Sequence, residues 1–230
     1  MALLLNGNSQ YGVVPYNALV NLTTAFTLAG TIRRSGSGPA QIMLGRPRTG
    51  NTTEWWSVGY RNGKPQFILS TNVGQPTTLT ANNAVNTNVW QHLAATWDGV
   101  TMRLYVDGVQ VITAAKGGTL TADTTPISVG AVGTGTTADS YLSGNIEDIR
   151  IYNRAMTANE IMTIFTTDGA DYIMDGVLLR LPLNEGGEGV AATTAGAFKD
   201  IGINKLNGNP VGSPTFAGGI TSFAKRVLRG

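Results

Sequence analysis

Fourteen carboxylates are the side chains of this 230-residue chain best suited to general acid–base chemistry. Glycoside hydrolysis would need two of them about 5–10 Å apart, one on each side of the bond that breaks. Glu147 and Asp148 are adjacent, so in a strand they would point to opposite faces. Glu185 and Glu188 lie in a glycine-rich segment with no strand-like alternation. We therefore expect no catalytic residues and no enzyme activity.

The other residues that often carry chemistry are rare. His92 is the single histidine, and it lies in a strand-like segment, where we interpret it as a packed core residue. There is no cysteine, which excludes disulfides and thiolate metal sites. A Gly-x-Ser-x-Gly nucleophile motif is also absent. We expect no cofactor.

Three aromatic residues are the candidate binding residues. Trp55 and Trp56 are neighbours in an apolar run that continues to Tyr60. Because adjacent strand residues face opposite sides, one tryptophan is expected in the core and the other on the surface. An exposed indole face can stack on the apolar C–H patches of a sugar. Trp55, Trp56 and Tyr60 are therefore predicted to bind carbohydrate, unless both tryptophans are structural and a loop covers the outer one.

The elements that would position these residues are short strands. Residues 89–114 contain two turn dipeptides, Asp98-Gly99 and Asp107-Gly108, of the kind that closes tight hairpins. Asn62-Gly63 gives the same signal earlier in the chain. Between Gly99 and Asp107, the residues Met102, Leu104 and Val106 alternate with Arg103 and Tyr105. This period of two predicts a strand with one face on a core and the other toward solvent. A three-stranded antiparallel meander is expected here.

One helix is predicted. The segment from Thr157 to Glu160 has the spacing of a capping box, in which the threonine hydroxyl caps the first turn and the glutamate reaches back. We expect a short helix near residues 158–166, with Ile161, Ile164 and Phe165 packing inward.

The composition limits the partners. Charged residues make up 13% of the chain, glycine numbers 30, and the formal charge is +2. No basic stripe with interleaved aromatics is present, so no nucleic-acid partner is expected. No apolar run approaches the ~18 residues of a membrane span, and the first ten residues lack the features of a signal peptide. We expect no membrane partner.

Two segments carry a family resemblance. Residues 90–108, WQHLAATWDG followed by MRLYVDG, resemble the core signature of laminin G-like, concanavalin A-like jelly-roll domains. Residues 128–161, SVGAVG followed by YLSGNIEDIRIYNRAMTANEI, resemble that family's second signature. The resemblance implies an all-β jelly-roll β-sandwich with one short helix.

The resemblance also directs attention to calcium. The family often has acidic residues in its first loop, where they help to hold calcium. Here residues 6–10 are Asn, Gly, Asn, Ser and Gln, which offer amides and a hydroxyl but no carboxylate. Calcium prefers several oxygen ligands with carboxylates among them. We therefore expect no metal site at this loop.

The C-terminal segment is in an unusual position. Residues 175–216 resemble the usual beginning of the same family, so the C-terminal strands would stand in permuted order. We expect one domain, 1–216, in which 175–216 supplies strands that pair near residues 2–6, within the chain or with a neighbouring subunit. The apolar run 177–183 is the strand expected to pair there. Residues 217–230 would form a basic arm that docks on a partner through Phe223, Lys225, Arg226 and Arg229.

Two functions remain open. The first is a non-catalytic bacteriophage virion component, such as a capsid decoration protein or fibre-like part. It would be assembled in the host cytoplasm and would contact other virion proteins or copies of itself. The second is a carbohydrate-binding, lectin-like module or adhesin, with glycans as partners and an extracellular location. The lectin-like fold and the aromatic residues favour the second, and the lack of an export signal favours the first.

Overall fold

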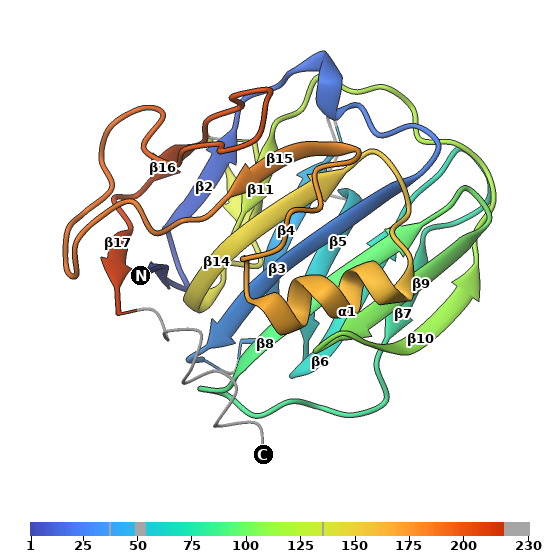
Figure 1. The fold of residues 1–230 in the computed structure, drawn as a ribbon, viewed down its shortest axis with the longest axis horizontal. Coiled ribbons are helices and arrows are strands. Elements are labelled where there is room, and N and C mark those ends of the chain that lie inside the picture. The colour runs from blue at the N-terminus through green and yellow to red at the C-terminus, as the bar shows by residue number, and fades with distance from the viewer. Residues whose placement is uncertain (37, 49–53, 135, 219–230) are drawn as a thin grey trace.

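The computed structural model describes residues 1–36, 38–48, 54–134 and 136–218 (Figure 1). Two antiparallel sheets pack face to face, and helix α1 (Ala158–Thr167) lies across the outer face of one of them. The predicted all-β sandwich with one short α-helix is confirmed. Among the described residues, no helix has both the length and the apolar character to cross a membrane.

The first sheet has the order β10–β9–β8–β3–β14–β1–β17, and β15 also pairs with β14. Its strands are β1 (Ala2–Asn6), β3 (Phe26–Arg34), β8 (Trp90–Trp97), β9 (Thr101–Val106), β10 (Val109–Ala115), β14 (Ser143–Tyr152), β15 (Val177–Leu181) and β17 (Thr215–Ala217). The predicted meander is β8–β9–β10, and the Asp107-Gly108 turn has positive φ at both residues, 50° and 80°.

The second sheet has the order β16–β2–β11–β4–β5–β6–β7. Its strands are β2 (Tyr11–Val14), β4 (Ala40–Pro47), β5 (Glu54–Arg61), β6 (Lys64–Leu69), β7 (Thr77–Thr80), β11 (Ile127–Val129) and β16 (Asn209–Val211). A small hairpin, β12 (Val132–Gly133) with β13 (Ala138–Asp139), and a 3-10 turn, η1 (Ala18–Val20), complete the elements.

The core lies between the two sheets. Met102 and Leu104 of β9 are fully buried there, as their alternation predicts. Phe26 of β3 lies at the centre of an aromatic group, with its ring 6.1 Å from that of Trp56 and 5.7 Å from that of Trp97. Such tilted ring pairs add stability beyond the buried area.

Helix α1 begins at the predicted capping box. The Thr157 side chain accepts the backbone N–H of Glu160, and the Glu160 carboxylate accepts the backbone N–H of Thr157 at 2.8 Å. A hydrogen bond from Arg154 is the largest of the contacts that lower the pKa of Glu160 to about 2. Ile161 and Ile164 are buried against the sheet, as predicted, whereas Phe165 is half-buried.

The C-terminal segment completes both sheets within the chain. The prediction that residues 177–183 pair with the strand near residues 2–6 is wrong, because β15 pairs with the second half of β14. Strand β14 has ten residues, and β1 pairs only with its first half, which leaves an open edge for β15. The strand that does pair with β1 is β17, with Ala217 opposite Ala2.

Candidate functional site

Two of the three predicted aromatic residues are core residues. Trp56 and Tyr60 point inward from β5, with exposed fractions of 0% and 2%. The Tyr60 hydroxyl donates to Oε1 of Gln91 at 2.5 Å, and the Arg34 guanidinium lies 4.3 Å from the ring centroid. Burial raises the pKa of Tyr60 above its ordinary value. Neither ring offers an exposed face to a sugar.

Trp55 is buried as well, so of the two alternatives the structure agrees with the second, in which both tryptophans are structural and a loop covers the outer one. Its exposed fraction is 9%. The indole Nε1 donates to Oδ2 of Asp123 at 2.6 Å, and the Arg48 guanidinium carbon lies 4.3 Å from the ring centroid. Asp123 comes from a sequence-distant loop and Arg48 from the end of the neighbouring strand, and strand alternation within β5 carries no information about either.

Trp55 belongs to a polar network at one end of the sandwich, where β2, β4 and β5 meet their loops. Arg46, at the end of β4, donates to the carbonyl oxygens of Val20 and Asp123 and to Oδ1 of Asn21, at 2.7, 2.5 and 2.8 Å. The Asn21 amide in turn donates to the Tyr16 hydroxyl at 3.3 Å. The network joins η1 to the segment before β11, and these two run along the upper edge of Figure 1.

Burial dominates the electrostatics of this network. It lowers the pKa of Arg46, while the nearby charge of Asp123 acts in the opposite direction. Nε of Arg46 is buried without a hydrogen-bond partner among the described residues. Three acceptors therefore fix the guanidinium. It holds the loop of Val20 and Asn21 against the loop of Asp123 and is shielded from solvent.

The outer side of the same network is accessible. Tyr16 has an exposed fraction of 42%, and Leu19, three residues on, has one of 53%. Asn21, Arg48 and Asp123 are half-buried. We call Tyr16, Asn21, Arg46, Arg48, Trp55 and Asp123 the loop-end site. An exposed aromatic ring beside a few fixed polar groups suits a ligand that has both an apolar face and hydroxyls.

Sequence reasoning found only part of the loop-end site. It selected Trp55, but it missed Tyr16, Asn21, Arg46, Arg48 and Asp123. Residue types gave no signal for them, because a lone tyrosine and asparagine between strands are common. Their association depends on three loops that only the folded sandwich brings to the same end.

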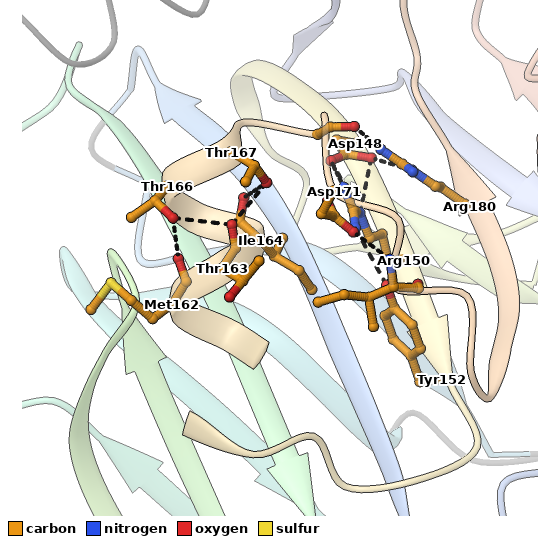
Figure 2. Close-up of polar contacts among 12 residues, drawn as sticks. Asp148, Arg150, Tyr152, Met162, Thr163, Ile164, Thr166, Thr167, Asp171 and Arg180 are labelled. Carbon is orange, nitrogen blue, oxygen red and sulfur yellow. Dashed lines mark hydrogen bonds and ion pairs between the residues drawn. The ribbon is translucent and has the colours of Figure 1, made fainter. Parts of the chain in front are cut away.

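A second polar cluster lies beneath the segment that follows α1 (Figure 2). The fully buried Arg150 donates to Oδ2 of Asp148 at 2.6 Å and to Oδ1 of Asp171 at 2.9 Å, and it also contacts the Tyr152 hydroxyl. Arg180 of β15 donates to Asp148 and to the carbonyl of Gly169. Both carboxylates are held by arginines, so this pair stabilises the fold and is not arranged for acid–base catalysis.

The remaining predicted residues lie elsewhere. His92 is buried in β8, with its ring 6.2 Å from that of Phe165, which agrees with a core role. The predicted arm residues Phe223, Lys225, Arg226 and Arg229 lie outside the described residues.

The first loop is organised by its own side chain. Oδ1 of Asn6 accepts the backbone N–H groups of Asn8, Ser9 and Gln10 at 3.0–3.2 Å. This oxygen is therefore engaged in closing the loop. Within the part of the chain that the structure describes, no three His, Asp or Glu side chains gather in an arrangement that would hold a metal ion.

We expect calcium to leave the melting temperature unchanged, because the first loop has no carboxylate and its amide oxygen is already bonded. Differential scanning fluorimetry with millimolar calcium, and then with excess chelator, tests this. A rise on adding calcium that the chelator reverses would contradict the prediction, since a ligand that binds the folded state stabilises it.

Comparison with known sequences identifies the same family as the motifs. A sequence model described as the concanavalin A-like lectin/glucanases superfamily matches residues 6–162. Human pappalysin-1 is 30% identical over 171 residues, which cover 68% of this chain and 10% of pappalysin-1. The chain therefore spans about a tenth of the length of that curated relative.

Solved structures share the fold. A putative carbohydrate-binding protein from Bacteroides ovatus superposes with a TM-score of 0.69 at 17% identity, covering 96% of this chain and 61% of that protein. The CBM40 of the Ruminococcus gnavus IT-sialidase, bound to α2,3-sialyllactose, gives a TM-score of 0.57 at 17% identity and covers 71% of this chain and 94% of its own. At this identity the likeness shows the fold alone.

Proposed function

We propose that this chain, which belongs to the concanavalin A-like lectin/glucanases superfamily, is a non-catalytic module that binds glycans at the loop-end site. The observation that carries the proposal is the continuous network from the exposed Tyr16 ring through Asn21 and Asp123 to Trp55. The described carboxylates that lie close together, Asp148 and Asp171, are neutralised by Arg150 and give no support to a hydrolase.

The site chemistry fits a saccharide. Tyr16 and Leu19 present apolar surface, on which the C–H face of a sugar ring can pack. Arg46 fixes the Asn21 side chain, and the Asp123 carboxylate accepts from the Trp55 indole and from the backbone N–H of Thr125. The orientation of both side chains is therefore set before a ligand arrives. Preorganised polar groups lose little entropy on binding.

The relatives support the same direction. One similar structure is that of a putative carbohydrate-binding protein, and another is the CBM40 of a sialidase bound to sialyllactose. The virion role predicted from the sequence has no counterpart among the relatives named above, and nothing in the loop-end site favours it. Our proposal is therefore the lectin-like alternative, at a site that includes Trp55 but neither Trp56 nor Tyr60.

A glycan array followed by titration of the best binder tests the proposal. Tyr16→Ala is expected to weaken binding about tenfold, because it removes the exposed ring of the site. Tyr172→Ala is the matched control, since Tyr172 is 94% exposed in the segment after α1 and should leave affinity unchanged. Equal melting temperatures of the two variants would show that folding is intact.

Two results would count against the proposal. If the wild-type chain binds no glycan on the array, the proposed glycan-binding function is wrong. A wild-type chain that binds a glycan with the same affinity after Tyr16→Ala would place the binding site elsewhere on the sandwich.

A further inference from the structure

Arg48 lies where a stacked ligand would lie. It follows directly after β4 ends at Pro47, and its guanidinium stands over the Trp55 ring at 4.3 Å from the centroid. The ring itself is fixed, because its Nε1 donates to Asp123 at 2.6 Å and its body packs with the core. Arg48 is half-buried, and no hydrogen bond or ion pair from it is recorded among the described residues.

The two partners in this contact differ in how firmly they are held. Trp55 has a backbone in β5 and a hydrogen-bonded indole, whereas the position of Arg48 depends on the stacking contact. A cation–π contact at an exposed site contributes only about 0.5–1 kcal/mol. Removing the guanidinium from the ring therefore costs little and leaves the ring in place.

We infer that Arg48 is a gate on the Trp55 ring, and that a bound sugar stacks on this face after displacing the guanidinium. The inference rests on the proposed function and adds a specificity residue to it. The Arg48 contact then explains why a ring whose face a saccharide could use is buried. Tyr16 supplies the accessible ring. Trp55 supplies a second ring, whose face becomes accessible to a ligand only when Arg48 moves.

The gate competes with the ligand, so its removal strengthens binding. Arg48→Ala is expected to raise affinity about two- to fivefold, the fold-change that corresponds to losing a competing contact of ~0.5–1 kcal/mol. The glycan affinity of Arg48→Lys should lie between those of the wild type and Arg48→Ala, because an ammonium keeps the charge but lacks the planar stacking surface. Arg61→Ala is the charge control, since Arg61 is exposed at the opposite end of β5.

Tryptophan fluorescence gives a readout that needs no glycan. Trp56 and Trp97 are fully buried and Trp90 is 5% exposed, so a change in quenching by acrylamide on Arg48→Ala reports on Trp55. We expect stronger quenching in Arg48→Ala than in the wild type and no such increase in Arg61→Ala. The increase should be absent when Trp55→Phe is combined with Arg48→Ala.

The array and the quenching separate the two claims. If the wild-type chain binds a glycan and Arg48→Ala binds it equally or more weakly, the gate is overturned and the proposed function stands. Unchanged quenching in Arg48→Ala also overturns the gate. If neither protein binds any glycan on the array, the proposed function fails and the gate fails with it. Stronger binding together with stronger quenching supports the gate.

Discussion

Arg150→Ala is expected to lower the free energy of unfolding by about 3–5 kcal/mol, because it strands a buried carboxylate. The Asp171 side chain is 1% exposed and the Arg150 side chain is fully buried, at 2.8 Å from each other (Figure 2). Asp148 would keep Arg180 as a partner at 3.0 Å. Asp171 would lose its ion pair and would have to be buried as an unpaired charge or take up a proton.

Urea denaturation at neutral pH measures this effect. Arg103→Ala is the matched control, because Arg103 pairs with Asp98 at 2.7 Å on the surface, where both side chains are about one-third exposed. An exposed pair contributes about 0–1 kcal/mol, so the control should lose far less stability. A loss for Arg150→Ala no larger than that of Arg103→Ala would show that the cluster in Figure 2 contributes little.

The same cluster predicts how stability depends on pH. Burial alone would raise the pKa of Asp171, but hydrogen bonds and charge from Arg150 outweigh it and hold the pKa below its ordinary value. A carboxyl group whose pKa is depressed by folding stabilises the folded state above its unfolded pKa, and this stability is lost as the pH falls through the folded pKa. The wild type should therefore lose stability in acid more steeply than Arg150→Ala, in which Asp171 has no arginine partner.

A chain that ends at residue 174 is expected not to fold. The segment that this deletion removes includes five buried apolar side chains, with exposed fractions of 0–4%: Leu179, Leu181, Leu183, Phe198 and Phe216. Burying each such side chain contributes about 1.5–3 kcal/mol, so their sum is comparable to the whole stability of a typical domain, ~5–15 kcal/mol. The deletion also opens the edge of β14 that β15 covers and the edge of β1 that β17 covers.

The control is a chain that ends at Gly218, which keeps every described strand and should melt cooperatively. Solubility, circular dichroism and thermal melting compare the two chains. A soluble, cooperatively melting monomer from the shorter chain would show that residues 175–218 are not needed to complete the sandwich.

Local patterns predicted the elements well, because turns and caps depend on neighbouring residues. Asn62-Gly63 and Asp107-Gly108 form turns with positive φ, and Thr157 caps α1 with Glu160 as its capping-box partner. Alternation also placed Met102 and Leu104 in the core. Tyr105, expected on the solvent side, is 2% exposed because α1 packs over that face. A strand pattern carries no information about a helix that docks from some 50 residues away in the sequence.

The prediction of which strands pair was less successful, because the partner of β14 changes at a single residue. Asp148 has a φ of 48° at a bulge in β14, and the pairing of β14 with β3 shifts at this point. The part of β14 before the bulge in the sequence pairs with β1, and the part after it pairs with β15. No residue pattern marked Asp148 as the division, so β15 was assigned to the wrong partner. The burial of Trp55 has a different cause, because Asp123 and Arg48, which lie outside β5, cover its ring.

The pairing of β1 with β17 also determines how the sandwich bears mechanical load. Ala2 lies opposite Ala217, so the outer ends of the two strands are side by side. Hydrogen bonds between antiparallel strands run perpendicular to the strands, and a force that separates residues 2 and 217 acts along these bonds. Such a force separates the opposite residues in succession, from Ala2–Ala217 to Leu3–Phe216 and then Leu4–Thr215, and breaks the hydrogen bonds between them one set at a time. Tension between these two points therefore unzips β17 at low force, before the long β3–β14 ladder carries any shear.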